Sequence, residues 1–412
     1  MSLESAALGA VEIDPPIFDP VSFRLTAQEV ELTALARRLG KARFAPRAAR
    51  HDREASFPTE NYRDLHEAKL LGICIPQDHG GLGASYRAYM LAAAEIGRYC
   101  GATALTFNMH VCSCLWSGAL ADDLDMGAAD RADHLRRRAR HYERIVRHGR
   151  IYAQPFSEGG AAAAGVAPFS TTAQAVDGGW IVTGKKIFAS LAGHADYYGV
   201  LCGEAKPGKK PSRRDTMYIA VPAQAPGVMV EGEWDPLGMR GTVSRNLLFT
   251  DVFVTEDEAL MPRGVYYQAA TRWPHMFLTL SPTYMGLAQA AYDFTVAYLR
   301  GEWPGMPVKR RMYPTKQIAV AHMRVMLEHT KALWFQAISE ARADPSREEC
   351  LRAYAAQYTV MENATELARL AIRTCGGQAM LKSLPLERIY RDSRCGSLML
   401  PWTAEICLDR IG

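Results

Sequence analysis

The sequence lacks the features that mark membrane-spanning, secreted and metal-binding proteins. No apolar run is long enough to cross a bilayer, and the first residues, MSLESAALGAVEIDPP, contain no basic segment followed by an apolar one. The nine cysteines form no CxxC pair and are scattered, most of them in apolar segments. We therefore expect a soluble cytoplasmic protein with reduced cysteines, without a signal peptide, a disulfide framework or a metal site.

A strong net charge is also missing. The 48 basic and 44 acidic residues leave a formal charge of only +4, which does not indicate a nucleic-acid-binding protein. Basic residues are concentrated in one segment, RADHLRRRARHYERIVRHGR (131–150), which we predict to be a helix with one apolar edge. Its basic face is either a solvated surface or a docking site for something acidic, such as the CoA nucleotide or an acyl carrier protein.

The spacing of apolar residues changes twice along the 412-residue chain. Residues 1–20 contain several prolines and no periodicity, so we expect a flexible arm there. Helical spacing over 21–150 gives way to short strand-like runs over 151–265, and helical spacing returns over 266–412. We therefore predict an α+β fold with an N-terminal α-helical domain, a central β-barrel and a C-terminal helical bundle.

Local signals mark the ends of several elements. Capping boxes, TAQE from Thr26 and SREE from Ser346, predict two helix starts. The Asp-Gly-Gly sequence at 177–179 separates two strand-like runs and predicts a hairpin. The Gly-Gly pair at 376–377 predicts the end of the last long helix, because glycine readily takes the left-handed conformation that ends helices.

Four stretches together resemble the acyl-CoA dehydrogenase family. They are LLGICIPQDHGGLG (70–83), GWIVTGKKIFAS and the residues after it (179–201), LGMRGTVSRNLLFTDVFVTEDEAL (237–260) and CGGQAMLKSLPLERIYRDSR (375–394). The resemblance implies a helical domain, a β-barrel and a C-terminal four-helix bundle. It also implies FAD as cofactor and a homodimer or homotetramer, since the nucleotide of the family's FAD reaches a neighbouring subunit.

The same resemblance implies flavin contacts for particular residues. PFSEGG (155–160) corresponds to the turn whose backbone N–H and hydroxyl meet the flavin ring. KKIFAS (185–190) corresponds to an aromatic that covers the ring and a hydroxyl residue after it, and the diglycine to the place where backbone approaches the pyrophosphate. The FAD-binding residues implied are Phe156, Ser157, Phe188, Ser190, Arg300, Gln317, Arg373, Gly376, Gly377, Thr403 and Glu405.

The glutamate that serves the family as catalytic base has no counterpart here. That glutamate removes the α-proton of an acyl thioester while the flavin accepts a hydride. When Thr403 is matched to the threonine that follows it, its place is taken by Pro401, and an alternative position used by some members is taken by Met276. His275, next to Met276, is a candidate base because imidazole titrates near neutral pH, or a helix-start histidine bonded to backbone.

Other positions depart from the family as well. The family's Gly-Ser-Asp is replaced by AAAA (161–164), and its phosphate-binding arginine is either Arg300, Arg310 or Arg311. A CoA-binding arginine is replaced by Phe277. Together with Leu400 and Trp402, Phe277 is expected to line a reduced or reshaped substrate pocket.

Three functions are consistent with these observations. The first is an FAD-dependent acyl-CoA dehydrogenase-like oxidoreductase of fatty acid metabolism, which desaturates a thioester of CoA or a carrier protein with a non-standard base. An electron-transfer flavoprotein is then the implied electron acceptor. The second is a flavin-dependent monooxygenase on the same scaffold, which needs no α-proton base. The third is a non-catalytic flavin-binding homologue.

Overall fold

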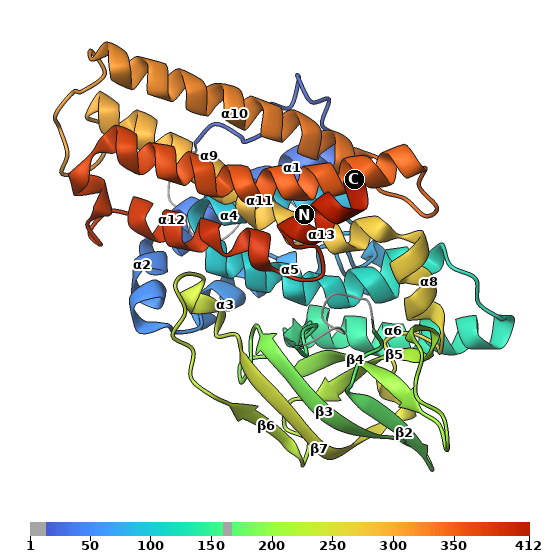
Figure 1. The fold of residues 1–412 in the computed structure, drawn as a ribbon. Helices are drawn as coiled ribbons and strands as arrows, with labels where there is room; N and C mark the ends of the chain where they lie inside the picture. The colour runs from blue at the N-terminus through green and yellow to red at the C-terminus, as the bar shows by residue number, and fades with distance from the viewer. Residues whose placement is uncertain (1–13, 160–166) are drawn as a thin grey trace.

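A computed structural model describes residues 14–159 and 167–412 (Figure 1). The AAAA segment at 161–164 and most of the expected flexible arm lie outside these residues. Helices from both ends of the chain form one layered body, and the strands form a sheet on one side of it (Figure 1). The helical segments before and after the sheet share one hydrophobic core.

The N-terminal helices begin where the capping box predicts. The Thr26 side chain accepts the backbone N–H of Glu29, and the Glu29 carboxylate accepts the N–H of Thr26. The helices of this region are α1 (Ala27–Leu39), α2 (Ala45–Glu54), α3 (Thr59–Glu67), α4 (Tyr86–Tyr99), α5 (Gly101–Leu115), the short η4 (Trp116–Leu120) and α6 (Ala128–His148).

The sheet curls without closing into the expected barrel. Its strands are β1 (Tyr152–Ala153), β2 (Thr172–Val176), β3 (Gly179–Ala189), β4 (Tyr197–Ala205), β5 (Thr216–Pro222), β6 (Val228–Glu231) and β7 (Arg245–Thr255). The order is β1-β4-β2-β3-β7-β6, and β5 pairs with β4. The edge strands β5 and β6 do not pair with each other in the described part of the chain, so the sheet is an open half-barrel. The predicted hairpin at 177–179 is confirmed as the β2–β3 turn.

A β-bulge in β3 positions Phe188, one of the predicted site residues. The pairing of β3 with β7 shifts register between Lys186 and Ala189. Within this bulge Phe188 has a φ of 50°, in the left-handed region that bulky residues rarely occupy. β-Bulges re-aim side chains, and here the bulge leaves the Phe188 ring exposed.

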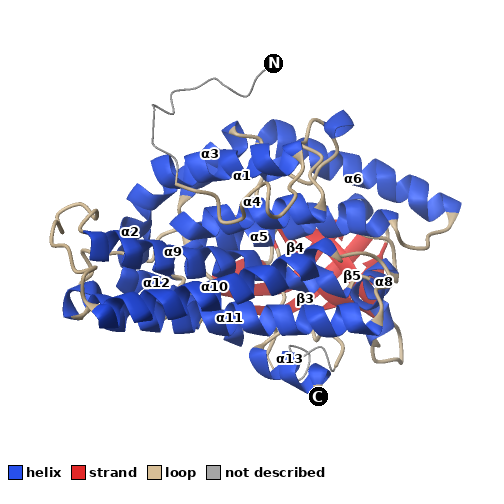
Figure 2. Ribbon diagram, turned by 90° about the horizontal axis from the view of Figure 1, so that it is seen from above, coloured by secondary structure: helices blue, strands red, loops and turns tan. Residues whose placement is uncertain are grey.

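The C-terminal region consists mainly of three long helices that pack against one another, with a shorter one against two of them (Figure 2). α11 begins at the Ser346 capping box and ends at Gly376, as predicted. The helices are α8 (Val265–Arg272), α9 (Ser281–Arg300), α10 (Pro314–Ser339), α11 (Arg347–Cys375), α12 (Leu386–Arg394) and α13 (Ala404–Ile411).

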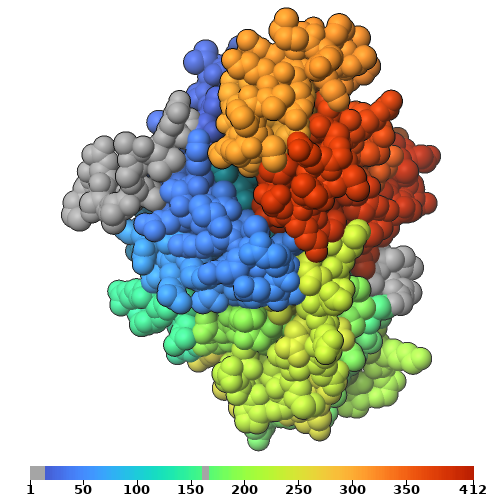
Figure 3. All heavy atoms as spheres, turned by 90° about the vertical axis from the view of Figure 1, so that its left-hand side faces the viewer, coloured from blue at the N-terminus to red at the C-terminus, as the bar shows by residue number. Residues whose placement is uncertain are grey.

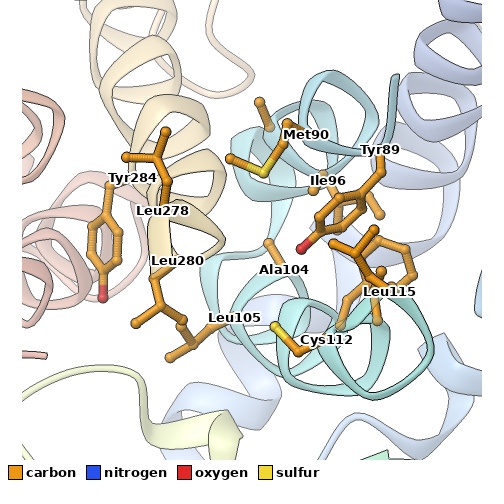
Figure 4. Packing of buried hydrophobic residues seen from close by; sticks show 14 of the residues in the cluster. Tyr89, Met90, Ile96, Ala104, Leu105, Cys112, Leu115, Leu278, Leu280 and Tyr284 are labelled. Carbon is orange, nitrogen blue, oxygen red and sulfur yellow. The ribbon is translucent and has the colours of Figure 1, made fainter. Parts of the chain in front are cut away.

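Close contact between α4 and α9 joins the two helical regions. A Cβ on Gly286 of α9 would lie 2.3 Å from the carbonyl oxygen of Ala94, so only glycine allows this approach. Figure 4 shows Met90 and Ile96 of α4 among the buried side chains of α5 and of the segment around Leu280. In the space-filling view the C-terminal helices and the N-terminal helices meet over a broad surface above the strands (Figure 3).

The basic helix α6 is held by ion pairs within the chain. Arg136 and Arg140 both contact Asp257, and Arg144 donates to both carboxylate oxygens of Glu258 at 2.7 Å. The predicted helix is confirmed, and three arginines of its basic face pair with Asp257 and Glu258 of this chain. No helix in the described residues is long and apolar enough to cross a membrane.

Candidate functional site

A cavity of about 380 Å³ lies where α5, the sheet and the C-terminal region meet. Eight residues singled out from the sequence line it: Phe156, Ser157, Phe188, Ser190, Met276, Phe277, Leu400 and Pro401. They come from four segments that are far apart in the chain. Tertiary folding therefore brings together the predicted ring-contacting residues and much of the predicted substrate pocket.

The Ser157 turn is fastened to β3. The backbone N–H of Ile187 donates to the Ser157 carbonyl at 2.8 Å. Next to it, the Lys186 ammonium lies 2.6 Å from the Glu158 carboxylate and also donates to the Leu201 carbonyl at 2.6 Å. Burial lowers the pKa of Lys186, and the charge of Glu158 opposes this shift. The two segments that would contact a flavin ring are thus joined by a backbone hydrogen bond and an ion pair.

Phe188 stands at the side of the cavity as an exposed aromatic platform. Its side chain is 67% exposed, and its ring meets the edge of Trp234 at a centroid distance of 6.3 Å. A large apolar side chain held out by a left-handed backbone is unusual, and such conformations cluster at ligand sites. An exposed aromatic face of this kind is suited to stacking against a planar ring system.

A chain of hydroxyl groups lies behind Ser190. The Thr242 hydroxyl donates to the Met239 carbonyl at 2.8 Å, which leaves its oxygen to accept from Ser244 at 2.7 Å. Ser244 in turn lies 2.8 Å from the Ser190 hydroxyl. If Ser190 donates to Ser244 and Ser244 donates to Thr242, the Ser190 oxygen keeps both lone pairs free to accept hydrogen bonds at the cavity. Thr242 ends the LGMRGT stretch (237–242), and the family resemblance predicts no site role for it or for Ser244.

The opposite wall of the cavity is formed by α5, for which the sequence predicted no role in the site. Leu105, Met109, Cys112 and Trp116 recur on one face of the helix and its continuation, and all four line the cavity (Figure 4 shows Leu105 and Cys112). Their helical periodicity is visible in the sequence, but it is the same pattern that a plain core face produces. Burial raises the pKa of the Cys112 thiol to about 12, so it is not a base.

None of the described residues that line this cavity is an aspartate, glutamate, histidine, lysine or arginine. Both expected positions of the family's glutamate, Pro401 and Met276, lie in the wall. Proline also has no backbone N–H, so Pro401 offers neither a carboxylate nor a main-chain donor for a carbonyl oxygen. The cavity therefore provides no side chain suited to remove a proton near neutral pH.

His275 lies outside this wall. It is fully buried, its carbonyl accepts from the Tyr86 hydroxyl at 2.7 Å, and its ring nitrogens have no partner among the described residues. Burial lowers its pKa to about 4. The ring is therefore neutral at physiological pH, and it is not one of the residues that border the cavity.

Of the residues expected to hold the nucleotide half of FAD, Arg373, Gly376 and Gly377 lie at the end of α11, outside this cavity. Lys316 donates to the Thr374 carbonyl at 2.5 Å, and Arg310 stacks over the Tyr298 ring at 4.7 Å. Tyr298 and Arg310 both reach Gln378, directly after the diglycine. Arg300 instead lies 4.0 Å from Glu302, and Gln317 donates to the Arg311 carbonyl at 3.0 Å.

The remaining predicted residues occupy the ends of these helices. Arg373, Gly376 and Gly377 form the end of α11, where a Cβ on either glycine would meet open space. Thr403 caps α13 by accepting the Ile406 N–H at 3.3 Å, and Glu405 is exposed in the first turn of that helix.

A second cavity of about 210 Å³ adjoins the first. Phe156, Phe277 and Pro401 line both and form the boundary between them. Trp402, fully buried, lines only the second cavity, and its ring lies 6.0 Å from that of Phe277. The second cavity is lined by two arginines, Arg213 and Arg410, whereas the described residues that line the first carry no charge.

Comparisons with known proteins agree on the family. Three family models match successive parts of the chain: acyl-CoA dehydrogenase N-terminal domain (residues 26–119), middle domain (154–252) and C-terminal domain (264–411). The chain is 27% identical to mitochondrial short-chain specific acyl-CoA dehydrogenase of Mus musculus over 382 residues, 92% of this chain and 87% of the relative.

Two solved structures share the fold. Butyryl-CoA dehydrogenase of Megasphaera elsdenii has a TM-score of 0.78 at 19% identity, over 94% of this chain and 98% of the other. Dibenzothiophene monooxygenase TdsC of Paenibacillus sp. A11-2 has a TM-score of 0.77 at 21% identity, over 93% of this chain and 96% of the other. With its three domains matched in order, this chain belongs to the acyl-CoA dehydrogenase family.

Proposed function

We propose that this chain is a flavin-dependent monooxygenase that acts on a neutral, mainly apolar substrate in the cavity of about 380 Å³. The observation that carries the proposal is the cavity wall, which in the described residues contains no acid, imidazole or amine. Removal of an α-proton requires such a group. Oxygenation by a reduced flavin does not.

The residues present fit a flavin. Phe188 offers a face to the ring, and the fastened Ser157 turn and the Ser190 hydroxyl offer polar groups beside it. When bound and reduced, the flavin supplies two electrons, so that one oxygen atom of O₂ enters the substrate and the other leaves as water. The chain's own part is to place the substrate beside the ring and keep water out, and the apolar α5 wall suits both tasks.

FAD is the proposed flavin, and a homodimer or homotetramer the proposed assembly. Arg310 and Lys316 stand by the diglycine and provide cations for a pyrophosphate. Neither lines the cavity with Phe188. A ring site and a phosphate site in separate places of one chain are consistent with an FAD that spans two subunits.

Dehydrogenation of an acyl thioester of CoA or a carrier protein is the second candidate. It is favoured by the match to the family's C-terminal domain over 264–411 and by the name of the mouse relative. This reaction would need a base that the described residues of the cavity wall do not supply, with His275 as the sequence-based candidate and an electron-transfer flavoprotein as acceptor.

One set of measurements separates these reactions. The flavin-loaded protein is titrated without oxygen with acyl-CoAs of increasing chain length, and its visible spectrum is followed. We expect no bleaching. The protein with reduced flavin is then mixed with ¹⁸O₂ and neutral aromatic compounds, and we expect one ¹⁸O atom in a product. Bleaching by an acyl-CoA would overturn the proposal. A protein that binds flavin but neither bleaches nor oxygenates would leave the non-catalytic flavin-binding homologue, and a protein that binds neither FAD nor FMN would contradict all three functions.

A further inference from the structure

We propose that one end of the cavity recognises a hydrogen-bond acceptor on the substrate, through the side-chain N–H groups of Trp116 and Gln154. This inference rests on the proposed function only in placing the substrate in the same cavity. It adds the class of substrate: a neutral, mainly apolar molecule that carries a carbonyl or a similar acceptor oxygen.

The Gln154 amide is bonded to a neighbour through its oxygen. Gln154 follows β1, is only 4% exposed and lines the cavity. Its Oε1 accepts a short hydrogen bond from the Tyr218 hydroxyl, which is buried in the sheet. Since the carbonyl oxygen is engaged, the amide presents its Nε2 hydrogens elsewhere, and they meet no acceptor among the described residues.

Trp116 adds a second donor next to the same tyrosine. It begins η4, where the α5 helix passes into a π-helical turn, and its side chain lines the cavity at 3% exposure. The Trp116 and Tyr218 rings lie 6.1 Å apart. The indole Nε1 also lacks an acceptor in the described part of the protein. Two enclosed donors without partners therefore flank Tyr218.

Unpaired buried donors are rare in folded proteins, because each loses its bonds to water without replacement. The buried Trp334 indole donates to Ser281 at 2.7 Å, whereas the Trp402 indole, which lines only the second cavity, has no acceptor among the described residues. Both side chains, Trp116 and Gln154, line the first cavity, and an acceptor group on a ligand there is the partner that we infer for them. These two N–H donors therefore favour ligands that place a hydrogen-bond acceptor at that end of the cavity.

The charge of the ligand follows from the rest of the wall. A carboxylate would also accept from these donors, but among the described residues no cation lines this cavity to offset the loss of its hydration. The two arginines of the second cavity lie beyond the Phe156–Phe277–Pro401 boundary. A neutral oxygen such as that of a ketone or amide is the acceptor that the wall suits.

Matched probes test the inference on the whole protein. Acetophenone carries a carbonyl oxygen, ethylbenzene has nearly the same shape without it, and benzoate carries the charge. Dissociation constants are measured by calorimetry, so that no turnover is needed. We expect acetophenone to bind about tenfold more tightly than ethylbenzene, the effect of one or two hydrogen bonds, and benzoate to bind more weakly than acetophenone.

Three variants locate the preference. Trp116→Phe and Gln154→Leu each remove a donor and should reduce the preference for acetophenone by about threefold to tenfold, with little change for ethylbenzene. Tyr218→Phe keeps both donors but frees the amide to rotate, and should weaken the preference less. Met109→Leu alters the α5 wall without touching a donor and is the matched control for cavity shape.

The outcomes are distinct. Equal binding of acetophenone and ethylbenzene by the folded wild-type protein overturns the inference, and so does a preference that survives both Trp116→Phe and Gln154→Leu. Tighter binding of benzoate than acetophenone overturns the neutral-substrate part. A preference that is lost in the variants, in a protein that shows no oxygenation, supports the recognition site while the proposed reaction fails.

Discussion

The Lys186 ammonium and the Glu158 carboxylate lie 2.6 Å apart, with side chains that are 0% and 1% exposed. The carboxylate also accepts the backbone N–H groups of Ser170 and Thr171. Burial raises the pKa of Glu158, but the Lys186 charge and these bonds hold it below its ordinary value. Since Ser157 precedes Glu158 and Phe188 follows Lys186 by two residues, the pair fixes the geometry of the proposed flavin site.

Replacing Lys186 with methionine should destabilise the protein strongly. The change leaves the Glu158 carboxylate buried without its cation, which typically costs about 3–5 kcal/mol. Urea denaturation measures the change in unfolding free energy. Lys185→Met is the matched control, because Lys185 is half-exposed and pairs with a half-exposed Glu231, a contact worth less than about 1 kcal/mol. Similar values for the two variants would contradict the role given to the buried pair.

Phe188→Gly should separate stability from flavin binding. Glycine tolerates the left-handed backbone at this position, so the flavin-free protein should keep its stability or gain up to about 1 kcal/mol. Loss of the aromatic face should weaken flavin binding at least tenfold, as measured by equilibrium dialysis. Phe253→Gly, at another exposed phenylalanine within β7, should instead destabilise and leave flavin affinity unchanged. Unchanged flavin affinity in Phe188→Gly would remove Phe188 from the site.

Acid should destabilise the fold through His110. Its Nδ1 accepts the Tyr152 N–H at 2.9 Å, which identifies Nε2, 3.0 Å from the Leu71 carbonyl, as the donor of a neutral ring. Burial lowers the pKa of His110 from 6.5 to about 4. The folded protein therefore binds a proton on His110 less readily than the unfolded chain does. The free energy of unfolding is highest above pH 6.5, and this group lowers it by about 3 kcal/mol as the pH falls to 4.

Unfolding free energies at a series of pH values from 7.5 to 4 measure this effect. His110→Gln can still accept and donate but does not titrate, so its curve should fall less steeply than that of the wild type. The exposed His148→Gln variant should follow the wild-type curve. Parallel curves for wild type and His110→Gln would show that His110 does not carry the pH dependence.

Placing a carboxylate at position 401 should create the missing base. Wild-type protein, whose cavity wall lacks a base, should not exchange the α-protons of butyryl-CoA with D₂O above background. Pro401→Glu should raise the exchange rate about 100-fold, a usual contribution of a positioned base. NMR follows the α-proton signal, and Pro304→Glu, on an exposed loop, is the control. Exchange by the wild type would identify a base elsewhere, and its loss in His275→Gln would point to His275.

Much of the fold could be predicted from the sequence because the signals are local. The Thr26 and Ser346 capping boxes, the hairpin at 177–179 and the helix end at Gly376 each depend on a few neighbouring residues, and the structure confirms all four. Closure of the sheet depends on pairing between strands that are distant in sequence. A β-barrel was therefore expected where the structure has an open half-barrel.

Some features of the candidate site could likewise be predicted from the sequence, and others could not. The sequence by itself identified the family, the segments that carry Ser157 and Phe188, and the absence of a glutamate at Pro401 and Met276, because each of these is a property of residue types in order along the chain. Only the tertiary structure decided that α5 forms the opposite wall, that His275 lies outside the cavity, and that Trp116 and Gln154 both contact Tyr218. These relationships arise from packing between segments far apart in the chain, and a helical face that lines a cavity has the same periodicity as one that fills a core.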